Sequence, residues 1–301
     1  MGTKQTIKRA LFYSTCFLAV IATSRFCHHA TQGFRLSKVR ANLFKQEKVS
    51  QVEESDREFL THLFKQKFHF LGRGLQSFAF ESEDGNYVLK LLNNRHQKKI
   101  ELFSLLTHFP MISSWAKKQA DYFGAKLDKT FQSYEIAFEE MREKTGLLYI
   151  HLYPTQELPE SLSIVDPLQI CHEIDPNQTG FLVQKKATLA YPALKKYLSD
   201  EDPEKVKRAL SSLVRLFFWK WRQGIADNDP LIRTNYGFID GEAIQIDVGP
   251  LSKQTVLQSK EENKRQIEKI TTSLKCWLNE NAPEFKPFLD QELHEQLSLQ
   301  E

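Results

Sequence analysis

A short run of the chain, residues 71–92, constrains the fold more than any other feature. It reads LGRGLQSFAFESEDGNYVLKLL, so a glycine-rich turn comes directly before two strand-like stretches. Gly72 and Gly74 bracket a tight loop, and backbone N–H groups in such a loop can face phosphate oxygens. The run therefore predicts a phosphate-binding turn.

The second half of the same run predicts a β-hairpin. Its strand-like stretches, residues 78–82 and 87–92, flank Asp84-Gly85, a pair that strongly favours a hairpin turn. A turn centred on this pair places the ammonium group of Lys90 beside the glycine loop. Because an unpaired ammonium group on an apolar strand face is costly, we also expect Lys90 to have an acidic partner.

A later segment carries a second hairpin signal. Residues 236–239 and 243–246 are strand-like and flank an Asp-Gly turn. With a loop of two or three residues, Asn235 lies opposite Ile246 or opposite Asp247 itself. One amide and one carboxylate then meet at the end of the hairpin. These hard oxygen ligands suit Mg²⁺ that bridges phosphate groups.

Together, the two segments resemble the protein-kinase-like superfamily. That family carries G-x-G-x-x-G-x-V before a lysine on the third strand, and here Ser77 stands for the last glycine and Ala79 for the valine. It also carries a metal-binding asparagine and a later D-x-G turn, which Asn235 and the Asp-Val-Gly run at Asp247 resemble. The resemblance implies an α+β, two-lobed fold with an antiparallel-sheet N-lobe, a reduced helical C-lobe, and binding of ATP and Mg²⁺.

The catalytic base is where the sequence departs from this family. Protein kinases place an aspartate five residues before the metal asparagine, within H-R-D-x-x-x-x-N. Here Asp229 lies six residues before Asn235, Asp227 lies eight residues before it, and no histidine precedes either aspartate. We predict that Asp229 is the catalytic residue, because Asp229-Pro230 begins an extended turn. Asp227 is the alternative, either as the base or as a group that orients the loop or contacts metal.

The resemblance also implies a glutamate partner for Lys90. The apolar spacing after the lysine strand predicts a helix over residues 95–108. Glu101 is the only acidic residue on this helix, so it is the candidate for the lysine–glutamate ion pair. Glu139 or Glu140 could replace it if the helix is displaced.

The rest of the sequence predicts a hinge, further strands and helices, and the domain boundaries. Residues 184–187, which include Lys185, fall where kinase-like folds have the hinge that binds adenine through backbone groups. Further strands are expected at residues 147–153, 168–173 and 180–187, and helices at residues 56–67, 115–144, 191–198 and 203–222. These elements predict a leader and linker over residues 1–45, an N-lobe with a helical insertion over residues 46–188, and a C-lobe over residues 189–301.

The leader contains an apolar stretch. Residues 10–23 are 14 uncharged residues with basic residues on both sides. A membrane span needs about 20 residues, so this stretch is more typical of a signal-peptide core. An uncleaved anchor and a buried N-terminal helix stay open as alternatives. We therefore expect a protein that is membrane-associated through this segment or secreted, with its kinase-like domain where ATP is available.

Composition and length argue against several classes of function. A net charge of +3 does not indicate a nucleic-acid-binding protein, and the four cysteines lack metal-ligand spacing. Only 54 residues follow Asp247, and they contain no A-P-E motif, which argues against a conventional protein kinase. The layout is similar to that of the aminoglycoside or choline phosphotransferases and the lipopolysaccharide-core kinases.

The resemblance thus implies transfer of the ATP γ-phosphoryl group to a hydroxyl of a small-molecule, glycan or lipid acceptor. The rival hypothesis is a pseudokinase that keeps the fold and acts as a membrane-associated binding module. The irregular aspartate spacing favours the pseudokinase. The presence of Lys90, Asn235 and Asp247 favours the enzyme.

Overall fold

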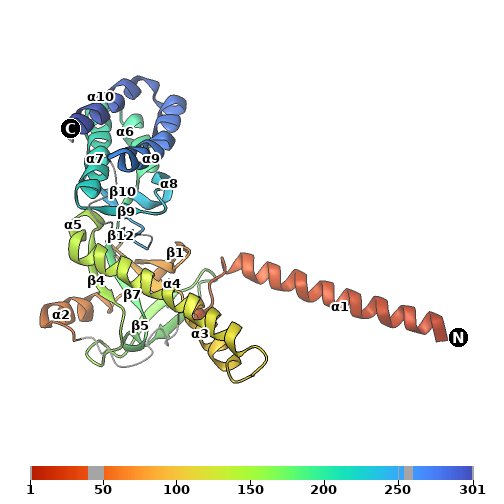
Figure 1. Cartoon of the computed structure of the whole chain (residues 1–301). Helices are drawn as coiled ribbons and strands as arrows, with labels where there is room; N and C mark the ends of the chain where they lie inside the picture. The colour runs from red at the N-terminus through yellow and green to blue at the C-terminus, as the bar shows by residue number, and fades with distance from the viewer. Residues whose placement is uncertain (1, 40–50, 250, 254–259, 300–301) are drawn as a thin grey trace. The chain divides into compact units, whose positions relative to one another are not determined.

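The computed structural model describes residues 2–39, 51–249, 251–253 and 260–299, and the chain is α+β (Figure 1). Residues 40–50, at the end of the expected leader, lie outside the described residues. The chain forms two compact units, which are treated separately below. Unit 1 comprises Met1–Asp84, Leu89–Arg95 and Tyr153–Phe181, and unit 2 comprises Gly85–Val88, His96–Leu152 and Leu182–Glu301.

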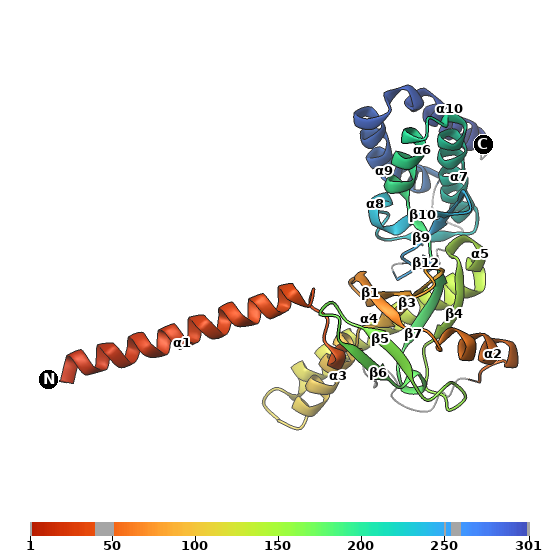
Figure 2. The same ribbon diagram turned by 180° about the vertical axis from the view of Figure 1, so that it is seen from behind.

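The main sheet has seven strands in the order β4-β7-β3-β2-β1-β5-β6 (Figure 2). The hairpin strands expected at residues 78–82 and 87–92 are confirmed. The sheet is mixed rather than wholly antiparallel, because β1 pairs in parallel with β5, with Phe68 opposite Ile164. The strands are β1 (Phe68–Arg73), β2 (Ser77–Ser82), β3 (Tyr87–Leu92), β4 (Leu147–His151), β5 (Leu162–Val165), β6 (Cys171–Ile174) and β7 (Phe181–Lys185).

Strand β6 begins later than the sequence pattern predicts. The expected strand over residues 168–173 is wrong at its start, because a turn precedes Cys171. Asp166 Oδ1 accepts the N–H groups of Leu168 (2.8 Å) and Ile170 (3.0 Å), and its Oδ2 lies 2.9 Å from His172 Nε2. Burial alone raises the pKa of Asp166, but the hydrogen bonds from His172 and from these backbone groups lower it overall. An aspartate that gathers local N–H groups stabilises a turn in place of a strand.

The first hairpin of unit 1 carries the glycine loop. Strands β1 and β2 are antiparallel, with Gly72 opposite Ala79, and the register shifts between Phe70 and Gly72. Side chains alternate between the two faces of a strand. Phe78 and Phe80 on β2 therefore share one face, and both are fully buried.

The segment over residues 34–39 packs on this hairpin. The Phe34 side chain is 3% exposed, and its ring lies 5.3 Å from that of Phe78 and 5.6 Å from that of Phe80. The N–H of Asn94 donates to the carbonyl of Lys38 at 2.8 Å. Phe34 and Val39, which is 1% exposed, are therefore part of the packed core of unit 1, a feature that the polar sequence around them did not reveal.

The leader forms one helix, α1 (Gly2–Ala30), which contains the predicted apolar stretch. Large apolar side chains along it, such as Leu11, Phe12 and Phe17, are exposed. Among the residues that the structure describes, no helix is both long and apolar enough to span a membrane.

The helices of unit 2 pack around α7, which coincides with the helix predicted over residues 203–222. Asp202 caps α7 by accepting the N–H of Lys205 at 2.9 Å, and Pro203 occupies the first turn, where proline is tolerated. Figures 1 and 2 both show α6, α7, α9 and α10 grouped together. The helices of unit 2 are α3 (Arg95–Leu106), α4 (Ser113–Glu140), α5 (Arg142–Thr145), α6 (Ala190–Ser199), α7 (Pro203–Arg222), α8 (Ile232–Asn235), α9 (Lys260–Asn281) and α10 (Lys286–Ser298); α3 begins at the last residue of unit 1, which also contains α2 (Glu54–Leu63).

Two small sheets hold the second hairpin and the loop before it. Strands β10 (Tyr236–Ile239) and β11 (Glu242–Gln245) pair with β8 (Thr188–Leu189) in the order β11-β10-β8, and β9 (Ile225–Asp227) pairs with β12 (Leu251–Lys253). Asp240 and Gly241 both have positive φ, 51° and 84°, as a two-residue type I′ turn requires. A Cβ at Gly237 would lie 2.4 Å from the carbonyl oxygen of Thr188, so this close strand pairing needs glycine.

Candidate functional site

The glycine loop of unit 1 is a tight turn between β1 and β2. The N–H of Gly74 donates to the carbonyl of Ser77 at 2.9 Å. This hydrogen bond closes the turn between Gly74 and Ser77, two residues of the glycine-rich motif. Gly72 and Gly74 are not among the described residues with positive φ, and a Cβ built at Gly72 meets nothing within 4 Å. The fold itself therefore does not require glycine at position 72.

Lys90 lies in the middle of β3, next to β2 in the sheet. It is partly buried and stands between Leu89 and Leu91, which are fully buried on the opposite face of the strand. Just past the end of β3, the N–H of Asn93 donates to the carbonyl of Gln76 at 2.8 Å. This bond joins the end of the lysine strand to the glycine turn, and both elements belong to unit 1.

Glu101, the predicted partner of Lys90, lies on α3 in unit 2 and accepts a hydrogen bond from Gln97 Nε2 at 3.1 Å. The alternative residue Glu140 is engaged elsewhere, because both of its carboxylate oxygens lie 2.6 Å from Lys253 Nζ. The ion pair between Lys90 and Glu101 stays a prediction.

The predicted hinge continues from β7. Gln184 is buried, and its Nε2 donates to the carbonyl oxygens of Thr145 and Ile246 at 2.5 and 3.3 Å. The N–H of Lys185 donates to the carbonyl of Gly146 at 2.8 Å. Because this N–H already donates a hydrogen bond within the protein, a backbone contact of Lys185 with adenine would use the carbonyl oxygen of Lys185.

The loop between β9 and β10 holds Asp229 and Asn235. Asn235 is 4% exposed, and its Nδ2 donates to the backbone carbonyl of Asp229 at 2.6 Å. The N–H of Ile246 donates to the carbonyl of Asn235 at 2.7 Å, so Asn235 lies opposite Ile246, one of the two registers predicted from the sequence. The short helical turn α8 follows Asp229 in the chain and ends at Asn235.

Asp227 is the centre of a buried hydrogen-bond network. Its Oδ1 accepts the N–H of Asp229 at 3.0 Å. Its Oδ2 accepts hydrogen bonds from Lys220 Nζ (3.3 Å), the Tyr236 hydroxyl (2.7 Å) and Gln245 Nε2 (2.8 Å). The Asp227 side chain is only 4% exposed. The carboxylate of Asp227 therefore makes hydrogen bonds in the protein interior, whereas Asp229 is an exposed residue.

Lys220 supplies the positive charge of this network, and sequence reasoning missed it. Its Nζ donates to Asp227, to the Tyr236 hydroxyl and, at 2.8 Å, to Gln245 Oε1. Burial lowers the pKa of Lys220, although the charge and hydrogen bond of Asp227 act in the opposite direction. Burial likewise raises the pKa of Tyr236, and Asp227 adds to that effect. The available signal was a lysine three residues after Phe217, on the apolar face of α7.

Gln245 joins this network to Asp247. Its Nε2 donates both to Asp227 and, at 3.0 Å, to the backbone carbonyl of Asp247. The Asp247 side chain accepts the N–H of Gly249 at 3.1 Å, which forms the turn expected of the D-x-G run. One buried amide therefore fixes the two acidic loops relative to each other.

Helix α4 holds the loop that follows Asp247. Ser133 is fully buried, its Oγ donates to the carbonyl of Val248, and it accepts the N–H of Leu251 at 2.7 Å. On the next residue of α4, burial raises the pKa of Tyr134, and the nearby charge of Asp247 raises it further. The carboxylate of Asp247 thus faces a hydroxyl that stays protonated at neutral pH.

The donor set fits a magnesium ion that is shared with phosphates. Asn235 Oδ1 accepts the Thr234 hydroxyl at 2.8 Å, and Asp247 supplies a carboxylate. Within the described ranges, no cluster of three or more histidine, cysteine, aspartate or glutamate residues is suited to a metal. Mg²⁺ commonly takes one or two protein ligands and completes its shell with water and substrate phosphate, so two oxygen donors suffice.

No family model matches the chain, and no curated protein matches it significantly. Among solved structures it is similar to WbdD bound to the kinase inhibitor LY294002, with 13% identity, a TM-score of 0.37, and coverage of 76% of this chain and 45% of that chain. The ROP18 kinase domain in complex with AMP-PNP and sucrose is 16% identical, with a TM-score of 0.31 and coverage of 63% of this chain and 52% of that chain. Rv3197 of Mycobacterium tuberculosis, in complex with erythromycin, is 10% identical, with a TM-score of 0.31 and coverage of 67% and 52%.

The chain spans less than half of the length of the WbdD chain. Its fold follows from the order of its own elements. A glycine hairpin and a lysine strand come first, α7 and the Asp229 loop follow, and a hairpin that ends in an Asp-x-Gly turn comes last. This is the order of elements that the sequence resemblance to the protein-kinase-like superfamily implies.

Proposed function

We propose that this chain is an ATP- and Mg²⁺-dependent phosphotransferase that acts on a hydroxyl of a small-molecule, glycan or lipid acceptor. The observation that carries the proposal is the buried network of unit 2. It binds the backbone of Asp229 and of Asp247 to one carboxylate and one amide, and Asn235 closes it on the Asp229 carbonyl. Phosphoryl transfer depends chiefly on positioning and on electrostatic stabilisation, which such a network supports.

The nucleotide is assigned to two parts of the chain. The turn that contains Gly72, Gly74 and Ser77 holds the phosphate oxygens through backbone N–H groups other than that of Gly74, which donates to the Ser77 carbonyl, and the ammonium of Lys90 neutralises the phosphate charge. The hinge around Lys185 accepts a hydrogen bond from the adenine amino group. Lys90 is then held by a carboxylate, and Glu101 is our candidate.

The reacting end of the nucleotide is assigned to the second hairpin. Asn235 and Asp247 hold the metal through their side-chain oxygens. Bound Mg²⁺ supplies charge stabilisation at the transferred phosphoryl group. Asp229 orients the acceptor hydroxyl through its carboxylate and accepts the proton that the hydroxyl loses. Asp227 holds the backbone of Asp229 and does not touch the acceptor.

One observation favours an enzyme over a scaffolding pseudokinase. The irregular spacing between Asp229 and Asn235 and the missing histidine before the aspartate were the two sequence arguments for a pseudokinase. The helical turn α8 accommodates that spacing, and the hydrogen bond from Asn235 Nδ2 to the Asp229 carbonyl is made despite it. The aspartate is therefore retained in a fixed and exposed position.

Nucleotide binding is the first expected outcome. In titration calorimetry, AMP-PNP should bind the wild-type chain in the presence of Mg²⁺, and at least about tenfold more weakly without it, because the metal neutralises phosphate charge. Lys90→Ala and Asp247→Asn should each weaken binding at least about tenfold, since each removes a charge at the phosphates. Asp240→Asn, a loss of the same charge at the exposed tip of the same hairpin, should have no effect. Absence of binding by the folded wild-type protein would refute the nucleotide assignment.

We also propose that α1 attaches the chain to a membrane. The exposed apolar side chains between Leu11 and Ile21 would be buried in lipid, which stabilises attachment by roughly 25 cal/mol per Å² of apolar surface. In cell fractionation, the full-length chain should sediment with membranes, and a variant that begins at Thr31 should stay in the supernatant. This start point keeps Phe34, which is part of the core. Recovery of both forms in the supernatant would show that the helix does not attach the chain.

A further inference from the structure

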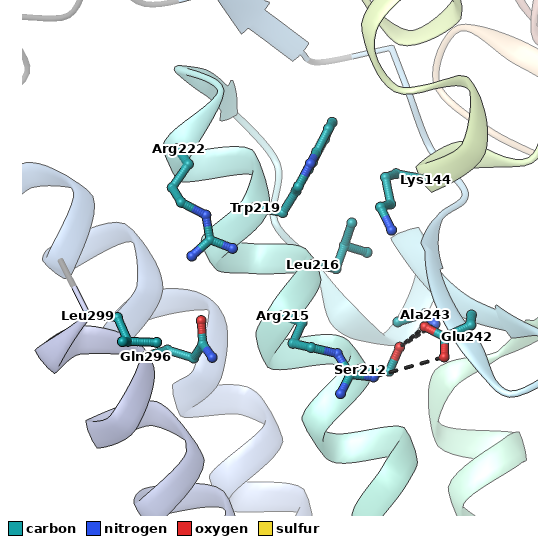
Figure 3. A pocket seen from close by; sticks show the side chains of 10 residues that line it. All are labelled: Lys144, Ser212, Arg215, Leu216, Trp219, Arg222, Glu242, Ala243, Gln296 and Leu299. Carbon is teal, nitrogen blue, oxygen red and sulfur yellow. Dashed lines mark hydrogen bonds and ion pairs between the residues drawn. The ribbon is translucent and has the colours of Figure 1, made fainter.

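A pocket of unit 2 lies outside the residues assigned to phosphoryl transfer. It has a volume of about 350 Å³ and is formed by α5, α7, β11 and α10 (Figure 3). This volume is near the lower end of the roughly 300–1,000 Å³ typical of small-molecule sites. Arg215 and Arg222 line the pocket from α7 and Lys144 lines it from α5, together with Trp219 and Gln296.

The α7 wall of the pocket is one face of the helix. Ser212, Arg215, Trp219 and Arg222 follow one another at intervals of three, four and three residues, which places them along a single stripe. The opposite face of α7 is buried in the core of unit 2, through residues such as Leu210. The stripe is therefore the outer face of a core helix, and yet it carries a half-buried tryptophan beside two arginines.

The charges in the pocket are unevenly compensated. Among the described residues that line the pocket, Glu242 is the only acidic one; its Oε2 accepts the Ser212 hydroxyl at 2.9 Å, and its Oε1 lies 3.9 Å from Arg215. In the described part of the chain, Lys144 and Arg222 have no carboxylate within ion-pair distance. Two of the three cations thus lack an internal counter-charge, so the pocket has a net positive charge of two.

We propose that this pocket binds a phosphomonoester of a compact polar molecule, such as a sugar phosphate. Arginine guanidinium groups form paired hydrogen bonds with phosphate oxygens, and the Lys144 ammonium adds a point charge. Trp219 offers a flat apolar face for a sugar ring, and the Gln296 amide can hydrogen-bond a sugar hydroxyl. The proposal does not depend on the phosphotransferase assignment, because no pocket residue belongs to that site.

Two sources can supply this group, a soluble metabolite or a lipid headgroup. The test therefore uses glucose 6-phosphate, with glucose as the uncharged control, and vesicles with and without phosphatidylinositol 4-phosphate. The full-length chain should bind glucose 6-phosphate but not glucose in titration calorimetry. Retention on the phosphoinositide vesicles above that on plain vesicles, with no binding of glucose 6-phosphate, would assign the same phosphomonoester site to a lipid headgroup.

The variant Lys144→Gln/Arg222→Gln should reduce binding of the responding probe at least about tenfold, because it removes both uncompensated cations. Lys207→Gln/Arg208→Gln is the matched control, since it removes two charges from α7 outside the pocket, and it should leave binding unchanged. Thermal melting establishes that each variant is folded. The proposal is overturned if neither phosphorylated probe binds the wild-type chain, or if the pocket variant, folded, binds as tightly as the control.

Discussion

Replacing Lys220 with methionine should lower the free energy of unfolding by about 3–5 kcal/mol, the range expected when one partner of a buried ion pair is removed. Lys220 and Asp227 are only 5% and 4% exposed at their side chains. Without the ammonium group, the Asp227 carboxylate stays buried and loses its counter-charge, while the Tyr236 hydroxyl and Gln245 Oε1 each lose a hydrogen bond. Equilibrium unfolding in urea measures the change.

A matched control lies on the same helix. Lys207 pairs with Glu204 at 2.9 Å on the surface of α7, and both side chains are well exposed. Lys207→Met should therefore change the free energy of unfolding by no more than about 0.5 kcal/mol. Adding Asp227→Asn to Lys220→Met should restore part of the loss, because it removes the uncompensated charge. An equal and small effect of the two lysine substitutions would contradict the buried network.

The hairpins and their order were predictable because local chemistry specifies them. Alternating apolar residues and Asp-Gly pairs determine strands and turns over a few residues, so β2, β3 and β10 were expected almost at their observed bounds. The two-residue turn at Asp240 and Gly241 sets the register that places Asn235 opposite Ile246. The helix over residues 203–222 was also predicted, from its apolar spacing.

The parts that the sequence did not predict depend on contacts between distant residues. Nothing local indicates that Ser133 on α4 binds the loop after Asp247, more than 100 residues away. The packing of Phe34 on Phe78 and Phe80 is likewise a tertiary contact of a segment with polar neighbours. The parallel pairing of β5 with β1 has no periodic signature, because short buried strands resemble other apolar runs.

In the candidate site, too, some features were predictable from the sequence and others depend on tertiary contacts. Its residues were identified from motifs, but sequence alone left two aspartates as the base. We propose Asp229 as the base because its side chain is exposed, whereas the carboxylate of Asp227 accepts hydrogen bonds inside the protein. Lys220 and Gln245, which make Asp227 a positioning residue, lie on separate elements whose contact no motif records.

The other large effect should come from Asp229→Asn. We expect it to reduce phosphate transfer about 100- to 10,000-fold, the usual contribution of a general base. Its AMP-PNP affinity and melting temperature should stay close to those of the wild-type protein, because the Asp229 side chain is exposed and acts on the acceptor. Asp227→Asn should instead lower the melting temperature, because it removes the charge opposite Lys220.

The proposed phosphotransferase function is tested most directly by measuring the transfer of labelled γ-phosphate from ATP into molecules of membrane and metabolite extracts. The measurement compares the wild-type, Asp229→Asn and Asp227→Asn proteins. We predict a labelled product with the wild-type protein, nearly complete loss with Asp229→Asn at unchanged AMP-PNP affinity, and a loss with Asp227→Asn that accompanies lower stability. Wild-type protein that binds AMP-PNP and labels nothing in either extract would contradict the phosphotransferase assignment and favour a binding module. Undiminished transfer by Asp229→Asn would contradict the role given to that residue.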